Sequence, residues 1–199
     1  MDENAIELFK NSIKYADVPE EVIEKYRGRV PDDFISLWRE YGFCTTEDGY
    51  YKIVNPDDYA DIWEDLFENA EDAGTVVVMV TAMADLIFYD SSTLNSTLFY
   101  DNNSMLCYAD IRHQNVHAIC DDFSMTMGDM RTYDFRSDEL SWDLYEKAVQ
   151  TLGVPAYDEC FGYEPLLSLG GKEKVENLRK VNLMVHLDIV SQMQDPAEW

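Results

Sequence analysis

Apolar side chains recur every three or four residues in the N-terminal part of the chain, a spacing that predicts amphipathic helices. Two segments open with a proline followed by two acids, Pro19-Glu20-Glu21 and Pro31-Asp32-Asp33. Proline fits the first turn of a helix, and acidic side chains there interact favourably with the helix dipole. Gly42 follows the second segment and predicts its end, because glycine readily adopts the backbone conformation that terminates helices. The expected helices span residues 4–15, 19–27 and 31–41.

A fourth helix is expected after a short strand at residues 50–54. The sequence Asn55-Pro56-Asp57-Asp58 supplies a capping side chain and a first-turn proline, and the helix is expected to run to about residue 70. At about 100° per residue, its apolar and acidic side chains separate onto opposite faces. The apolar face carries Tyr59, Ile62, Trp63, Leu66, Phe67 and Ala70. The acidic face carries Asp57, Asp61, Glu64, Asp65, Glu68 and Asp72.

The pattern changes after Gly74 to short β-branched or aromatic runs separated by Asn, Asp and Ser, which predicts a meander of antiparallel strands. The expected strands are residues 76–81, 85–89, 97–100, 105–109 and 115–119. Two further helices are expected at about residues 138–152 and 174–193, and Asn182 is the point at which the second would break. Helices, then strands, then helices predict an α+β fold: a central, mostly antiparallel sheet flanked by helices, with two lobes in one compact body.

Composition supports a folded protein and gives its charge. Of the 199 residues, 46% are hydrophobic and 13% aromatic, which is enough to form a sizeable core. The 40 acidic and 15 basic residues give a net charge of −25, which repels nucleic acid and anionic membranes and speeds the encounter with basic partners. The chain shows no secretory signal, no membrane-spanning run and four irregularly spaced cysteines. A cytoplasmic protein with reduced thiols is therefore expected.

The acidic residues are unevenly distributed. The 59 residues between Lys52 and Arg112 contain twelve acids and not one lysine or arginine. A solvated surface is the commoner explanation of such a stretch, yet like charges at i,i+4 on one helix destabilise it. The alternative is that the acidic face of the fourth helix contacts a basic partner. The candidate contact residues are Asp57, Asp61, Glu64, Asp65, Glu68 and Asp72.

Candidate chemistry elsewhere is weak. Cys107, His113, His117 and Cys120 include soft metal ligands, but their spacing matches no standard zinc site, so no metal or other cofactor is expected. No nucleophile elbow and no dinucleotide fingerprint occur, which favours a protein that is not an enzyme. Gly170-Gly171-Lys172 suggests a phosphate-binding loop, but a Walker loop needs glycine at position 166 and Ser or Thr at position 173. Leu166 and Glu173 stand there instead, so we predict a structural turn with no bound nucleotide.

The segment after residue 160 resembles the C-terminal domain of bacterial immunity proteins to type VI secretion DNase effectors. The matching motif is Gly162-Tyr163-Glu164-Pro165-Leu166-Leu167-Ser168-Leu169-Gly170-Gly171, followed by Glu176-Asn177-Leu178 and His186-Leu187. Leu166 replaces the usual alanine. The resemblance implies that Gly162, Pro165, Gly170 and Gly171 set the fold and contact no ligand.

The N-terminal part resembles the GAD-related domain, through residues 18–43 and 50–59, and it also echoes SMI1/KNR4-type proteins. Two domains are therefore expected, a GAD-related domain at residues 1–120 and a type VI immunity C-terminal domain at residues 121–199. The resemblance implies a non-enzymatic antidote. Its partner would be a cognate toxin, a basic nuclease domain whose active site or substrate groove it occludes, with no direct contact to nucleic acid or membrane. The alternative is a regulatory or scaffold module without a toxin.

Overall fold

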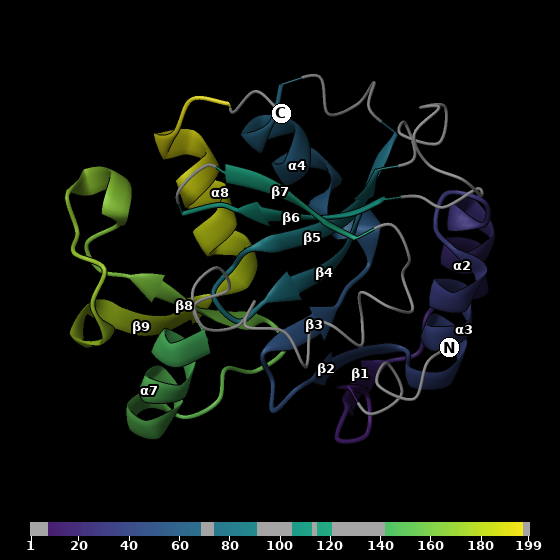
Figure 1. Cartoon of the computed structure of the whole chain (residues 1–199), viewed down its shortest axis with the longest axis horizontal. Helices are drawn as coiled ribbons and strands as arrows, with labels where there is room; N and C mark the ends of the chain where they lie inside the picture. Colours follow the sequence, from purple (N-terminus) through teal and green to yellow (C-terminus); the bar gives the residue numbers. More distant parts are fainter. Residues whose placement is uncertain (1–7, 69–73, 91–104, 113–114, 121–141, 197–199) are drawn as a thin grey trace.

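The computed structural model describes residues 8–68, 74–90, 105–112, 115–120 and 142–196 (Figure 1). A seven-stranded antiparallel sheet crosses the molecule with its strands in sequence order, each paired with the next. Its strands are β1 (Ile13–Ala16), β2 (Phe43–Thr46), β3 (Tyr51–Ile53), β4 (Thr75–Thr81), β5 (Leu86–Asp90), β6 (Met105–Asp110) and β7 (Asn115–Cys120). A separate antiparallel pair consists of β8 (Glu159–Tyr163) and β9 (Leu178–Asn182).

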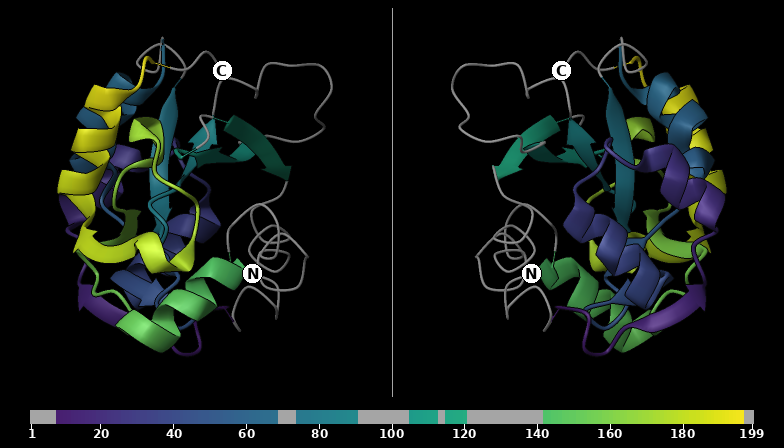
Figure 2. Two further views of the ribbon diagram at one scale, coloured as in Figure 1. Left: turned by 90° about the vertical axis from the view of Figure 1, so that its left-hand side faces the viewer. Right: turned by 90° about the vertical axis from the view of Figure 1, so that its right-hand side faces the viewer.

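Helices flank these strands. The α-helices are α2 (Glu20–Tyr26), α3 (Asp32–Tyr41), α4 (Ala60–Leu66), α7 (Trp142–Leu152) and α8 (Leu183–Met193), and the 3-10 turns are η1 (Pro56–Tyr59), η3 (Leu167–Leu169) and η4 (Val175–Asn177). Figure 2 shows α4 and α8 together on one side of the sheet, in contact with each other. This arrangement confirms the predicted α+β class with an antiparallel sheet flanked by helices.

The sheet is apolar on both faces. Along β5, Ile87 and Tyr89 join the core under α2, α3 and α7, whereas Leu86 and Phe88 join the core under η1, α4 and α8. Alternate residues of a strand point to opposite faces, so a strand buried on both sides must be apolar at nearly every position. Each residue from 76 to 89 is buried. The two cores therefore share one sheet as their common wall.

The C-terminal segments are bonded directly to the sheet region. The Phe161 amide donates to the carbonyl oxygen of Ala82 over 2.7 Å. The Lys52 ammonium group, on β3, donates to the Ala156 carbonyl over 2.8 Å. Burial lowers the pKa of Lys52 to about 8. The Tyr157 hydroxyl donates to the Ile53 carbonyl over 2.9 Å. Each core thus contains side chains from both sides of the expected boundary at residues 120 and 121, and that boundary remains a prediction.

Several predicted elements differ from the structure. Residues 13–16 form a strand, so the first predicted helix does not extend to residue 15. The fourth helix begins as a 3-10 turn and ends at Leu66, well before residue 70. In the last predicted helix, residues 178–182 pair with β8 as a strand, and only residues 183–193 are α-helical. The Asn182 side chain accepts a hydrogen bond from the Val185 amide and caps this shorter helix.

Other predicted elements are confirmed or fall outside the described residues. Helices α2 and α3 and strands β3 to β7 lie close to their predicted positions, whereas β2 and β8 were missed. The α7 helix ends before Gly153, whose φ of 76° suits the predicted stop. The predicted strand at residues 97–100 lies outside the described part of the chain. Among the described helices, none has the length and apolarity needed to cross a membrane.

The shared sheet makes α8 essential to the stability of the whole chain. Leu187 on α8 is fully buried in the core that α8 shares with α4 and the sheet. We expect Leu187→Ala to lower the free energy of unfolding by about 2–5 kcal/mol, because it leaves a cavity. We also expect the variant to unfold in one cooperative transition, followed by circular dichroism in denaturant.

Val185 supplies the matched control on the same helix, because its side chain is exposed. Val185→Ala should change the free energy of unfolding by less than about 0.5 kcal/mol. Two separate transitions, with only one of them shifted by Leu187→Ala, would contradict a single cooperative unit.

Candidate functional site

The acidic face of the fourth helix is positioned by the turn that precedes it. The side-chain oxygen of Asn55 accepts a hydrogen bond from the Asp57 amide at 3.3 Å, which caps the 3-10 turn η1. Pro56 occupies the first turn, where no amide donor is needed. The chain thus leaves β3 and turns directly into η1 and α4.

The inner face of α4 fixes the rotation of the helix about its axis. Ile62, Trp63 and Leu66 are buried in the core against the sheet. The Trp63 ring lies 4.3 Å from the Phe88 ring between centroids, and its indole N–H donates to the Thr75 hydroxyl over 2.8 Å. An indole buried with its one donor satisfied holds a helix in a defined orientation. The opposite face of α4 is therefore directed outward.

Three of the candidate acids, Asp61, Glu64 and Asp65, occupy that outward face and are exposed, as the helical periodicity predicts. Glu68 is also exposed, two residues after the helix ends. No lysine or arginine occurs in the sequence from residue 53 to residue 111, so bases near these acids must come from other parts of the chain. We call these four residues the α4 acidic face. Asp72, the last candidate, lies outside the described residues.

Asp57 has a different environment from these four. Its carboxylate accepts hydrogen bonds from the Lys25 ammonium group and from the Tyr26 hydroxyl, the latter at 2.5 Å. Partial burial alone would raise the pKa of Asp57, but the hydrogen bonds from Lys25 and Tyr26 outweigh it and lower that pKa below its usual value. Asp57 therefore links η1 to α2 through an intramolecular ion pair at the surface.

The border between α2 and α4 carries both signs of charge. A groove of about 250 Å³ lies there, lined among others by Lys25, Arg29, Asp57 and Glu64. The Arg29 guanidinium lies 5.1 Å from the centre of the Tyr26 ring. Basic side chains thus border the α4 acidic face on the α2 side.

A second acid from the segment between Lys52 and Arg112, which contains no lysine or arginine, also forms an intramolecular ion pair. Asp85 is fully buried, and its carboxylate accepts hydrogen bonds from Arg112 at 3.3 Å through each oxygen. Arg112 also reaches Glu173 at 3.5 Å, in the loop before β9. Two of the twelve acids, Asp57 and Asp85, therefore neutralise bases, and the stretch presents less negative charge to solvent than a count of residues suggests. Arg112 is the first basic residue after this segment. Its position was the only feature of the sequence that pointed to an ion pair with one of these acids.

The glycine motif forms a tight loop. Gly170 has a φ of 82°, in the left-handed region that favours glycine. A Cβ atom on Gly171 would lie 2.0 Å from the Pro165 carbonyl oxygen, and one on Gly162 would lie 2.7 Å from the His186 ring. Neighbouring segments therefore approach too closely for a side chain at Gly162 or at Gly171.

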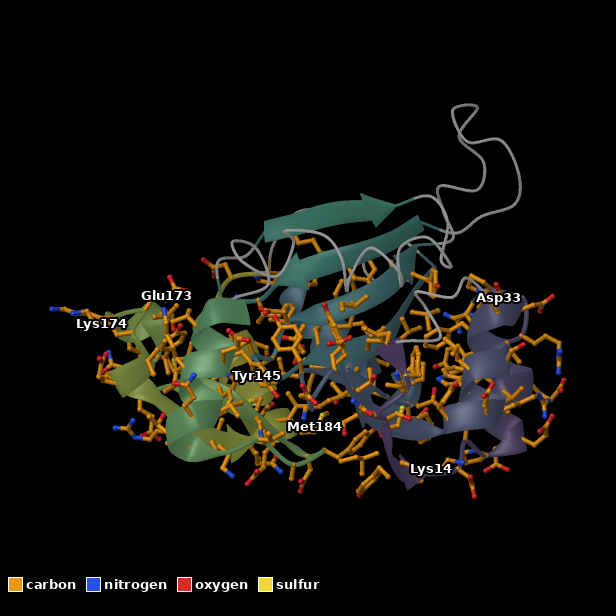
Figure 3. All side chains as sticks on the ribbon, turned by 60° about the horizontal axis from the view of Figure 1, so that its bottom comes forward. Lys14, Asp33, Tyr145, Glu173, Lys174 and Met184 are labelled. Atoms are coloured by element: carbon orange, nitrogen blue, oxygen red, sulfur yellow. The ribbon has the colours of Figure 1, made fainter. Side chains whose placement is uncertain are left out.

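Figure 3 shows Glu173 and Lys174, just beyond this loop, at the opposite end of the molecule from Asp33 of α3.

Backbone amides of the loop are used within the loop itself. The Leu169 and Gly171 amides donate to the Leu166 carbonyl at 3.0 and 2.9 Å, and the Gly170 amide donates to the Leu167 carbonyl at 2.9 Å. A phosphate-binding loop directs its amides toward the anion. These donors are turned inward, in keeping with the expectation of a structural turn.

The expected lack of a metal site concerns residues that the structure describes only in part. His113 lies outside the described residues, and the side chains of Cys107, His117 and Cys120 are not described. Where side chains are described, no three His, Cys, Asp or Glu residues are grouped to hold a metal ion. Cys44 and Cys160 are buried free thiols, and burial raises the pKa of each to about 12, so both stay protonated at neutral pH.

Known proteins match the chain in two ways. The family described as "GAD-like domain" matches residues 1–99, and the family described as "T6SS immunity protein Tdi1, C-terminal" matches residues 121–194. The fold is similar to the crystal structure of Atu4351 from Agrobacterium tumefaciens, with a TM-score of 0.75 over 96% of this chain and 89% of that chain. The two sequences are 20% identical, so this likeness concerns the fold alone. No curated protein matches the sequence.

The loop geometry ranks two substitutions. Gly170→Ala meets open space but keeps a left-handed backbone, so we expect it to lower the free energy of unfolding by about 1 kcal/mol. Gly171→Ala should cost more, because its Cβ would displace the backbone at Pro165. Thermal and chemical unfolding of both variants give the comparison, with the exposed Lys172→Ala as a control.

Equal effects of the two glycine substitutions would contradict this account of the loop. ATP and GTP should leave the melting temperature of the wild type unchanged, and a specific stabilisation by either nucleotide would show that the loop binds phosphate after all.

Proposed function

We propose that the chain, which matches the GAD-like domain over residues 1–99 and the C-terminal part of the T6SS immunity protein Tdi1 over residues 121–194, is an immunity protein that binds and neutralises a cognate secreted toxin. Both family resemblances predicted from the sequence are confirmed by these matches. The proposed action is occlusion of the toxin's active site or substrate groove in the cytoplasm. It requires binding and no catalytic step by this chain.

We propose further that the toxin is a basic nuclease domain. A nuclease must attract the phosphates of its substrate, and it does so with lysine and arginine side chains. The observation that supports this choice is the α4 acidic face, with three exposed carboxylates on one short helix and a fourth, that of Glu68, just beyond its end. Carboxylates fixed on a rigid helix can occupy the positions of phosphates in such a groove. The net charge of −25 attracts the same partner over a longer range.

Charge at such a contact acts mainly on the rate of association. Complementary charges accelerate diffusional encounter, and salt weakens the effect because the Debye length falls to about 10 Å at 0.1 M. Exposed carboxylates at the edge of a contact should therefore affect association more than dissociation. This distinction makes the role of the α4 acidic face measurable.

The test reverses the four charges. We expect Asp61→Lys, Glu64→Lys, Asp65→Lys and Glu68→Lys together to slow association with the cognate toxin domain by at least about tenfold at low salt. The difference should shrink at high salt. Stopped-flow or surface-based kinetics measures the rates, and co-expression with the toxin domain measures rescue of growth, which should weaken.

The matched control is a second variant with the same net charge, in which four acids outside the α4 acidic face are changed to lysine. Glu21, Glu40, Glu146 and Glu176 are exposed on α2, α3, α7 and η4, and none of them belongs to the α4 acidic face or lines the groove beside it. Changing four acids to lysine alters the net charge by +8 in either variant, from −25 to −17. The control should slow association much less than the α4 variant, because position matters as well as total charge.

Three outcomes separate the parts of this proposal. A wild type that neither binds the toxin domain nor rescues growth would refute the immunity function. Binding with equal association rates for both charge variants would leave the function intact and remove the α4 acidic face from the contact. Tight binding to a toxin domain without nuclease activity would correct the class of toxin.

A further inference from the structure

The last helix, α8, carries apolar side chains on both faces, and its outer face also exposes Asp188 and Gln192. Its inner face packs Leu183, Leu187 and Val190 into the core. Its outer face exposes Val185, Ile189 and Met193, whose side chains are 57%, 40% and 51% exposed. We call these three residues the α8 apolar stripe.

The spacing of the stripe makes it one continuous surface. Residues four apart on a helix lie on the same face and are neighbours in space. Positions 185, 189 and 193 therefore form a single ridge along α8. A helix on the surface of a protein normally presents polar side chains to water, because only its inner face is buried. An outward apolar ridge of this kind is therefore a candidate contact surface.

The stripe adjoins the α4 acidic face. α4 and α8 contact each other and bury their inner faces in the same core. Figure 2 shows the two helices together on the same side of the sheet in both views. Their outer faces therefore belong to one side of the molecule, with apolar side chains on α8 and carboxylates on α4. An apolar centre bordered by charged groups is the usual composition of a protein–protein contact.

We propose that the α8 apolar stripe is the apolar centre of the toxin contact and that the α4 acidic face is its charged border. This inference rests on the proposed immunity function and adds the surface to it. The partner that fits is a basic protein domain with an apolar patch beside its lysines and arginines. The apolar part holds the bound complex together, and the acidic part speeds its formation.

A second copy of this chain is a poorer occupant of the same surface. A two-fold dimer pairs the same patch on both subunits. Pairing the stripes would bring two α4 acidic faces close together, on two chains that each carry a net charge of −25. Like charges placed opposite each other across a contact oppose association. A basic partner removes this repulsion and gains from the same carboxylates.

The test replaces the stripe by polar side chains of similar helix propensity. We expect Val185→Gln, Ile189→Gln and Met193→Gln together to raise the dissociation rate of the toxin-domain complex at least tenfold. The association rate should stay within about threefold of the wild type, because no charge changes. Growth rescue on co-expression should weaken, and the melting temperature of the chain alone should be nearly unchanged.

The edge strand β1 offers the control. Ile13 and Tyr15 are 72% and 65% exposed, and they belong to a strand that pairs with β2 at the far edge of the sheet from β7. Ile13→Gln and Tyr15→Gln together remove a comparable exposed apolar surface. This variant should bind the toxin domain as tightly as the wild type.

The outcomes decide between the surfaces. If the wild type binds but the α8 variant dissociates at the wild-type rate, the stripe is not in the contact and the immunity function still stands. Weaker binding by the β1 variant alone would place the contact at β1. A dimer of the free chain that the α8 variant abolishes, seen by light scattering, would assign the stripe to self-association. If the triple variant proves unstable, Ile189→Gln alone allows the same comparison, with a smaller expected increase in the dissociation rate.

Discussion

The structure depends on the burial of the hairpin formed by β4 and β5, in which each residue from 76 to 89 is buried. A hairpin that is apolar on both faces cannot be stable with one face in water, so two layers of helices are required. One cover comes from α2, α3 and α7, and the other from η1, α4 and α8. Because α7 and α8 follow residue 120 in the chain, the C-terminal segment completes both cores.

The same constraint determines which side chains face outward. Once Ile62, Trp63 and Leu66 are held against the sheet, the acids on the same helix must point away from it. These acids are Asp61, Glu64 and Asp65. Once Leu187 is held in the same core, the opposite side of α8 is exposed whatever residues it carries. The acids of α4 and the apolar stripe of α8 are therefore presented on a rigid layer. Preorganised side chains lose little conformational freedom on binding, which suits a tight antidote.

The sequence predicted the helix ends that local residue patterns determine. It missed the elements and ion pairs that depend on residues distant in the sequence. The proline-acid openings of α2 and α3, Gly42 and Gly153 mark helix ends through local chemistry, and those ends are confirmed. By contrast, residues 178–182 read as helix from their spacing, and they form a strand because β8 lies beside them. The periodicity of the fourth helix placed Asp61, Glu64 and Asp65 outward correctly. It could not reveal the partners of the paired acids, which lie 31 and 32 positions from Asp57 and 27 positions from Asp85 in the sequence. The stripe on α8 was missed because an apolar residue in a predicted helix is taken for core until the packing shows which face is buried.

We propose, in short, that α4 and α8 form the side of the molecule that a toxin covers. Amide hydrogen exchange measured on the chain alone and in complex with the cognate toxin domain tests this claim directly, because it reports protection segment by segment. We expect slower exchange in the complex over residues 60–66 and 183–193, with α7 and β1 unchanged. Protection of β1, or of α2 and α3, with α4 and α8 exchanging as in the free chain, would contradict it.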